Sequence, residues 1–144
     1  MAIPNNRVNR FIEDQDTRVS VGIKLPFGRQ PGSSKGYFAT TDTTLDAVKQ
    51  DVRLLLMTQR GERLFQPTLG MNIRRFLFEQ ITDNTVIEIE NDIVETFNRW
   101  LPFVVLNDIE VDLKDQDMNK IKINIQFNIV NTPSELQSVG VVLG

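Results

Sequence analysis

Hydrophobic residues recur along this chain with two different periods, one typical of helices and one typical of strands. The first helix is predicted to begin near Thr43 or Thr44, because Thr43 precedes Asp46 by three residues and could satisfy free amides at the helix start. Its apolar residues recur every three or four positions: Leu45, Val48, Val52, Leu55 and Leu56. We expect Gly61, beside Arg60, to end this helix in a left-handed conformation.

Two further helices are predicted between residues 72 and 101. The short one is capped by Asn72 and points three residues inward, namely Ile73, Phe76 and Leu77. The longer one begins at Asp83 or Asn84 and stops at Pro102, which cannot continue a helix. Its apolar face consists of Val86, Ile89, Ile93, Phe97 and Trp100, widened by Ile87, Val94 and Leu101. A face of this width implies packing against more than one neighbour.

Beyond residue 107 the hydrophobic period changes to two, which predicts strands. Residues 108–113 alternate acidic and aliphatic side chains, and the segment KDQDMN then supplies a turn. In the next run one face holds Ile121, Ile123, Ile125, Phe127 and Ile129, and the other holds Lys122, Asn124, Gln126 and Asn128. These two runs predict a hairpin with one apolar and one polar face. The segment TPSE at 132–135 interrupts the pattern before a last segment that could add a further strand.

The first forty residues are predicted to form an arm that is partly extended or flexible. Residues 17–27 contain a short alternating run, with Val19, Val21, Ile23 and Leu25 on one face, and residues 29–36 have the composition of a loop. The element order predicts an α+β fold with segregated elements. In this fold, residues 1–40 form the N-terminal arm. Residues 41–144 form a domain whose amphipathic helices pack on a C-terminal antiparallel hairpin or small sheet.

The composition restricts the chemistry. With 144 residues, of which 40% are hydrophobic and 24% charged, the chain fits one soluble domain with a core. It contains no cysteine and no histidine, which excludes Ser-His-Asp and Cys-His catalysis and the usual zinc sites. No apolar run is long enough to span a membrane, and the N-terminus does not resemble a signal peptide. We expect no metal, no cofactor and no membrane partner.

Charge is unevenly distributed along the chain, whose net charge is −3. Residues 1–36 carry six basic and three acidic groups, and residues 49–79 carry the same numbers. Residues 83–100 contain five acids and one arginine. Such separation suits docking between complementary protein surfaces. It argues against nucleic acid as a partner, because the domain as a whole is acidic.

The segment RGERLFQPTLGMNIRRFLFE lies between two predicted helices and is the richest in candidate functional residues. It does not fit a phosphate-binding loop, because Gly61 and Gly70 are too far apart and no Gly-Lys-Ser/Thr sequence occurs. Arg63, Arg74 and Arg75 either contact a partner or solvate a helix surface. We expect a rigid connector in which Pro67 stiffens the crossing and Gly70 allows the next turn.

Carboxylate chemistry is the remaining enzymatic option, since glycosidases use two carboxylates across a sugar cleft. The candidates are Glu62, Glu79, Glu88, Glu90 and Glu95. Most of them lie on the polar face of the long helix, and no aromatic-lined cleft is predicted, so a solvated surface explains them better. Asp115 and Asp117 lack the glycine and the terminal glutamate of a calcium-binding loop, and we interpret them as a polar turn.

From about Thr41 onward the sequence resembles the small baseplate wedge family of contractile tails, which is often called lysozyme-like. Members include a wedge protein of T-even phages and a baseplate subunit of type VI secretion systems. The resemblance rests on Gly61-Glu62-Arg63, Pro67, Gly70 and Leu77-Phe78-Glu79, placed between two helices and followed by a helix and an alternating hairpin.

The resemblance implies a structural, non-enzymatic role in the tail baseplate of a virion or a related injection system. Family members lie in the inner baseplate in a ring of several copies, here expected to be about six. They contact the core-bundle proteins of the wedge, and hub or tube-proximal proteins are further expected partners. They also provide the starting template for the tail sheath, because their C-terminal sheet resembles the sheath sheet into which extended arms of sheath subunits insert as added β-strands. Assembly is expected in the cytoplasm of the bacterial host.

The same resemblance implies which residues contact partners. The expected wedge contacts are Gly61, Glu62, Arg63, Pro67, Gly70, Arg74, Arg75, Pro102 and Phe103. The family's Glu-Pro-Arg motif corresponds here to Leu101-Pro102-Phe103, so an apolar contact through Phe103 is expected to replace a charged one. The expected sheath-contact strand, with an unpaired edge, consists of Ile121, Ile123, Ile125, Phe127 and Ile129. Glu62 and Arg63 either lock the connector internally or meet the wedge.

Two other functions stay open on the sequence alone. The first is a peptidoglycan-cleaving, lysozyme-like enzyme of the baseplate that uses Glu62 or Glu79. The second is a free-standing adaptor outside any tail.

Overall fold

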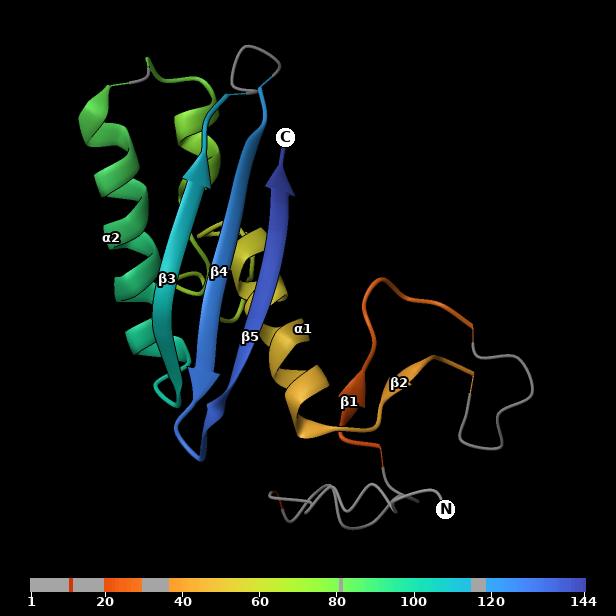
Figure 1. Cartoon of the computed structure of the whole chain (residues 1–144). Coiled ribbons are helices and arrows are strands. Elements are labelled where there is room, and N and C mark those ends of the chain that lie inside the picture. Colours follow the sequence, from red (N-terminus) through yellow and green to blue (C-terminus); the bar gives the residue numbers. More distant parts are fainter. Residues whose placement is uncertain (1–10, 12–19, 30–36, 81, 115–118) are drawn as a thin grey trace. The chain divides into compact units, whose positions relative to one another are not determined.

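The computed structural model describes residues 11, 20–29, 37–80, 82–114 and 119–144, and all statements below concern these residues (Figure 1). Within them the chain contains two α-helices, one 3-10 helix and two small antiparallel sheets, which confirms the predicted α+β class. The chain divides into two compact units, Met1–Gln50 and Asp51–Gly144. The predicted domain boundary after residue 40 stays a prediction.

The N-terminal unit contains a minimal two-stranded sheet. Strand β1 (Gly22–Ile23) pairs antiparallel with β2 (Thr40–Thr41), and a single bridge joins Arg29 to Phe38. The alternating run predicted over residues 17–27 therefore forms only a two-residue strand among its described residues, and Pro26 lacks the amide that a continued ladder would need. Residues 17–19 and most of the predicted loop, 30–36, lie outside the described residues.

Helix α1 (Thr44–Met57) begins where the sequence predicts. The Asp46 amide donates a hydrogen bond to the Thr43 hydroxyl, 3.2 Å away, so Thr43 satisfies one of the free amides at the helix start. The end of the helix was predicted wrongly. Met57 is the last helical residue, and Gly61 instead shapes a turn further on, with a φ of +92°. The Glu62 amide closes this turn on the Gln59 carbonyl at 3.1 Å.

The short helix η2 (Ile73–Leu77) is a 3-10 helix. Its three predicted inward residues, Ile73, Phe76 and Leu77, are all buried, which confirms their assignment. Asn72 precedes the helix as predicted, but its side chain makes no capping hydrogen bond. The main-chain amide of Asn72 is used instead, and it donates to Asp92 on the next helix.

Helix α2 (Asp83–Trp100) starts at one of the two predicted positions. The residue before it, Thr82, donates its amide to the Thr85 hydroxyl at 3.1 Å, and this closes the first turn. The predicted core positions Ile89, Ile93 and Phe97 are fully buried. The predicted widening of the face was partly wrong, because Ile87 and Val94 are exposed. Helical spacing placed them near the apolar face, but no described element covers them.

The C-terminal sheet has three strands: β3 (Val104–Asp112), β4 (Ile121–Ile129) and β5 (Thr132–Leu143). Their order is β3-β4-β5, and both pairings are antiparallel, which confirms the predicted hairpin and adds a third strand. The segment TPSE does not interrupt the strands as predicted. It begins β5, because the chain reverses over Val130 and Asn131, and Thr132 pairs with Ile129.

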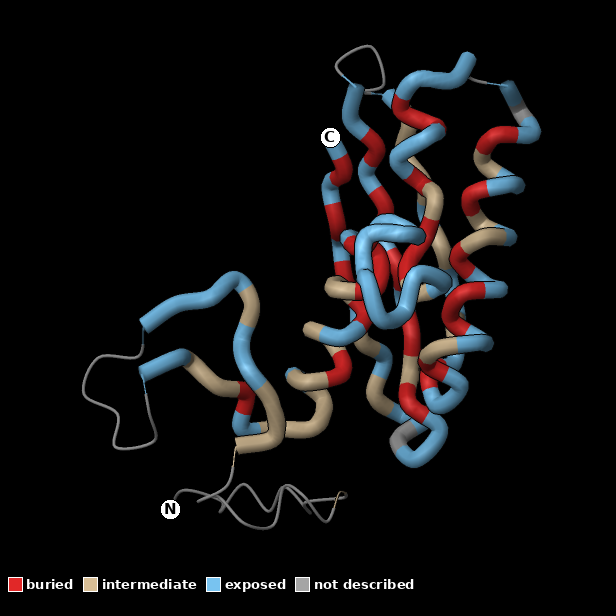
Figure 2. Tube along the Cα trace, turned by 180° about the vertical axis from the view of Figure 1, so that it is seen from behind, coloured by how far each residue is buried: buried red, intermediate tan, exposed pale blue. Residues whose placement is uncertain are grey.

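One face of this sheet forms the core of the C-terminal unit. Helices α2 and η2 lie on that face, and buried and exposed residues alternate along the strands (Figure 1, Figure 2). The five predicted inward residues of β4 are all buried: Ile121, Ile123, Ile125, Phe127 and Ile129. Burying one such side chain stabilises the fold by roughly 1.5–3 kcal/mol. The opposite face carries exposed polar side chains such as Asn124 and Gln126.

Residues 58–71, here called the connector, form a closed loop after α1. The Met71 amide donates to the Thr58 carbonyl at 2.9 Å, and the Arg60 amide donates to the Met71 carbonyl at 3.2 Å. Gly70 lies at this closure with a φ of +104°, and an added Cβ would collide with the Thr58 carbonyl oxygen. The position therefore requires glycine for both its conformation and its lack of a side chain.

Replacing Gly70 with alanine should destabilise the protein by more than about 2 kcal/mol, because backbone strain and a backbone collision act together. Gly61→Ala is a matched control. Gly61 also has a positive φ, but no atom lies within 4 Å of an added Cβ, so only strain of about 1 kcal/mol is expected. Chemical denaturation of the full chain measures both values. Equal losses for the two variants would contradict the close approach at Gly70.

Candidate functional site

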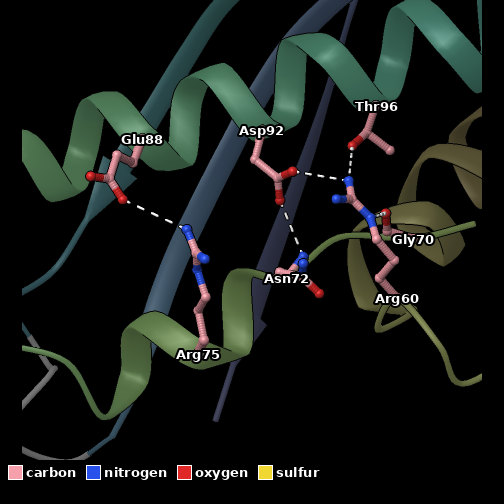
Figure 3. A network of polar contacts seen from close by, with 7 residues as sticks. All are labelled: Arg60, Gly70, Asn72, Arg75, Glu88, Asp92 and Thr96. Atoms are coloured by element: carbon pink, nitrogen blue, oxygen red, sulfur yellow. Dashed lines mark hydrogen bonds and ion pairs between the residues drawn. The ribbon is translucent and has the colours of Figure 1, made fainter. Parts of the chain in front are cut away.

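An ion pair fastens the connector to helix α2 (Figure 3). Arg60 Nη2 lies 3.0 Å from Asp92 Oδ1 and 3.4 Å from the Thr96 hydroxyl, while its Nε donates to the Gly70 carbonyl at 3.4 Å. The other carboxylate oxygen of Asp92 accepts the Asn72 amide at 3.1 Å. The Asp92 side chain is only 18% exposed, so this pair is better shielded than an ordinary surface pair.

The sequence did not predict the ion pair between Arg60 and Asp92. This pair holds the connector internally, which is one of the two roles predicted for Glu62 and Arg63. Arg60 and Asp92 are 32 residues apart, and no local pattern links them. Glu62 makes a shorter-range contact, in which its Oε2 accepts the Gln59 amide at 3.0 Å. Arg63 is exposed and forms no hydrogen bond or ion pair with the described residues, so it can contact a partner.

The tip of the connector presents two large apolar side chains to solvent. Leu64 is 94% exposed and Phe65 is 99% exposed, and neither was among the predicted contact residues. The tip is held from within, because the Gly61 amide donates to the Pro67 carbonyl at 2.7 Å. The main chains of Gly61 and Pro67 therefore hold the tip together, whereas the side chains of Leu64 and Phe65 are exposed to solvent. Figure 2 shows the connector exposed along most of its length.

The two arginines of η2 lie on its exposed side. Arg75 forms an ion pair with Glu88 of α2 at 3.6 Å (Figure 3). Its guanidinium group also lies over the Phe76 ring, 4.5 Å from the ring centroid. Both partners in this ion pair are more than half exposed, so the pair contributes little stability. Arg74 forms no hydrogen bond or ion pair with the described residues. Both arginines can therefore bind an acidic partner surface with little loss of stabilising contacts inside the fold.

The segment after α2 combines a buried and two exposed residues. Leu101 is buried and its amide donates to the Phe97 carbonyl at 2.8 Å, which completes the helix end. Pro102 is exposed, and the Phe103 side chain is 41% exposed. The Phe103 carbonyl accepts the Val130 amide at 3.1 Å, which ties this segment to the β4–β5 turn. An apolar contact through Phe103 is therefore sterically available.

The predicted sheath-contact strand needs a correction. Strand β4, which carries Ile121, Ile123, Ile125, Phe127 and Ile129, is the middle strand of the sheet and pairs with β3 on one side and β5 on the other. Its main chain cannot accept a further strand, because both of its edges are occupied, and its apolar side chains are buried in the core. The edge that was expected to be unpaired is filled by the C-terminal segment of the same chain.

The two outer edges of this sheet differ in character. Strand β3 carries three acids, Asp108, Glu110 and Asp112, and its register shifts between Leu106 and Asp108. Charges and bulges are the devices by which proteins protect an edge from pairing. Residues 136–143 of β5 contain no charged residue and no proline. Within the described residues, β5 therefore offers the edge better suited to strand addition.

The described residues hold no group of three or more acidic side chains placed to bind a metal ion. None of the helices in the described ranges combines the length and apolar character needed to cross a bilayer.

Comparison with known sequences supports the resemblance. The family model described as "Baseplate wedge protein gp25" matches residues 42–134, which is more than half of the chain. The chain is also similar to the baseplate wedge protein gp25 of Enterobacteria phage T4. The two are 23% identical over 132 residues, which cover 92% of this chain and 90% of the phage protein.

Solved structures share the fold. A candidate tail lysozyme from Geobacter sulfurreducens matches with a TM-score of 0.62 and 23% identity, over 70% of this chain and 90% of that protein. A chain of the anti-feeding prophage baseplate matches with a TM-score of 0.56 and 27% identity, over 83% of this chain and 81% of that one. A chain of the type VI secretion baseplate complex has a TM-score of 0.52 and 13% identity, over 67% and 89%. The family match over residues 42–134 places this chain in the family of the baseplate wedge protein gp25.

Proposed function

We propose that this chain is a structural baseplate subunit of a contractile tail, which joins the wedge and starts the sheath by accepting a strand. The observation that carries the proposal is the family match over residues 42–134, combined with the uncharged stretch 136–143 of the outer strand β5. The expected partners are core-bundle proteins of the wedge, hub or tube-proximal proteins, and a sheath subunit. The chain would occupy a ring of several copies in the tail baseplate, after assembly in the host cytoplasm.

Strand addition at β5 is supported by the chemistry of its edge. A strand added there gains main-chain hydrogen bonds of about 1 kcal/mol net each, and several in series hold a segment against mechanical load. Leu136 and Val142 lie on the exposed face of β5, each 57% exposed, and they can pack against side chains of the added strand. The acidic β3 edge is poorly suited to the same role.

Wedge contact is supported by the connector tip. The connector is closed by Gly70 and fastened through Arg60, so little conformational entropy is lost when it binds. Exposed aromatic and arginine side chains are the types that dominate binding energy at protein interfaces. The tip provides both in Arg63 and Phe65, and Phe103 adds a second aromatic after α2.

The lysozyme-like alternative has no specific observation in its favour. The candidate tail lysozyme shares the fold at 23% identity, which carries no activity to this chain. Of the two carboxylates proposed for catalysis, Glu62 accepts a main-chain hydrogen bond in an exposed turn. A peptidoglycan-cleavage assay on the purified protein tests this alternative. Activity that disappears on replacing Glu62 or Glu79 would overturn the structural proposal.

Lysines at the β5 edge should block sheath initiation while leaving wedge formation intact. The double variant Leu136→Lys and Val142→Lys places charges beside the incoming strand, and both positions are already exposed. The control is Val105→Lys on β3, which is 44% exposed and should have no effect. Electron microscopy of assembly mixtures counts baseplates with and without sheath. Normal sheaths with the double variant, or their loss with the control, would assign the role to another edge.

Truncating Arg63 should impair wedge association without changing stability, because Arg63 has no internal partner among the described residues. Glu62→Ala should also leave a soluble protein and weaken assembly. Arg60→Ala is the contrasting variant. It should lose about 1–2 kcal/mol of stability, because Asp92 keeps its charge but loses its partner. Thermal denaturation measures stability, and co-purification with wedge proteins measures association. Unfolding of the Arg63 variant would show that Arg63 has a structural role.

A further inference from the structure

A groove beside Trp100 is left unfilled by the fold. It has a volume of about 200 Å³ and lies between the C-terminal half of α1, the connector and the end of α2, all within the Asp51–Gly144 unit. Its apolar surface is formed mainly by Leu54, Leu69, Trp100 and Leu101. We call this hollow the Trp100 groove. Cofactor and drug-sized ligand pockets measure roughly 300–1,000 Å³, so the Trp100 groove is better matched to one or two side chains.

The Trp100 groove also contains one charge of each sign, Asp51 on α1 and Arg63 on the connector. Neither side chain forms a hydrogen bond or ion pair with the described residues, and no ion pair joins them to each other. Burial among the neighbouring side chains raises the pKa of Asp51 above its ordinary value of 3.8. Asp51 is exposed as a residue, so its carboxylate is only partly desolvated, and a cation placed beside it would compensate for the lost solvation.

We propose that the Trp100 groove binds a segment of a partner protein that places a lysine or arginine against Asp51. A neighbouring aliphatic side chain of that segment packs between Leu69 and Trp100. Charge complementarity selects this partner, because an anionic or purely apolar ligand leaves Asp51 without a cation. Arg63, at the connector side, is available to an acidic group of the same segment. This inference rests on the proposed function, in which the partner is a wedge protein.

The position of the groove agrees with such a contact. Its residue Leu101 directly precedes Pro102 and Phe103, and Arg63 precedes the exposed Leu64 and Phe65 of the connector tip. The groove therefore connects the two sets of expected wedge contacts, which lie about 40 residues apart in sequence. A partner segment lying in the groove would contact both sets at once.

A dipeptide titration tests the groove directly. The probe is N-acetyl-leucyl-lysine amide, added to the isotope-labelled full chain and followed by NMR. We expect saturable shifts of the Trp100 indole and the Leu54 and Leu69 methyl signals, with a dissociation constant of about 1 mM. Replacing lysine by norleucine in the probe, or Asp51 by asparagine in the protein, should weaken binding at least about tenfold. Absence of shifts, or equal shifts with either change, would overturn the proposal.

Association with purified wedge proteins separates this proposal from the general function. Asp51→Lys should weaken association at least about tenfold, whereas Asp108→Lys, an equal charge change on exposed β3, should not. If the unaltered chain does not associate with wedge proteins at all, the proposed function fails, while the dipeptide titration still decides on the groove. If it associates and Asp51→Lys has no effect, the groove proposal alone fails. If the chain forms a dimer and Asp51→Lys dissociates it, the groove binds a second copy of the chain. That outcome also overturns the proposal.

The stability of Asp51→Asn tests whether the carboxylate is uncompensated. Because the folded-state pKa of Asp51 is raised, the folded chain holds its proton more tightly than the unfolded chain. The unaltered protein should therefore lose stability relative to Asp51→Asn as the pH rises from the ordinary pKa of 3.8 through the higher folded-state pKa. It should keep that deficit at neutral pH. Denaturation at acidic and neutral pH measures the difference. The opposite trend would mean that a cation such as Arg63 already compensates Asp51, and the charge argument would fail.

Discussion

The burial of one face of β4 against the helices is the constraint on which the remaining structure depends. Its five alternating apolar residues are withdrawn from water, and each contributes roughly 1.5–3 kcal/mol. A slip of one residue would turn all of them toward solvent, so the register of β4 against β3 and β5 is fixed. Because β4 pairs on both sides, any strand from another protein must attach at an outer edge of the sheet.

The connector shows how internal contacts and partner contacts are divided within a short segment. Arg60 forms an ion pair with Asp92 inside the fold, and Gly70 allows the backbone to approach Thr58 closely. These contacts hold the segment in one conformation. Arg63, Leu64 and Phe65 lie between them and point into solvent without internal partners among the described residues. A segment held this way presents its binding groups at a small entropic cost.

Asp51 illustrates a different arrangement, in which an exposed acidic residue has its carboxylate partly buried beside apolar side chains. Its carboxylate is kept near leucines and a tryptophan without a counter-ion, although Arg63 borders the same groove. Together with residues 136–143 of β5 and the exposed connector tip, the Trp100 groove is one of three surfaces of the C-terminal unit at which we propose that partners bind.

The sequence by itself determined which elements form and which of their faces are buried. The start of α1 just after Thr43, the inward residues of η2, the core of α2 and the apolar face of β4 all follow from local spacing. Only the tertiary structure decided that β5 would occupy the second edge of β4, that Arg60 would pair with Asp92, and that Ile87 and Val94 would remain exposed. Periodicity reports the geometry of one segment, whereas strand neighbours and ion pairs depend on segments that meet only when the chain folds. The sequence therefore indicated the family, and the fold decided where a partner can bind.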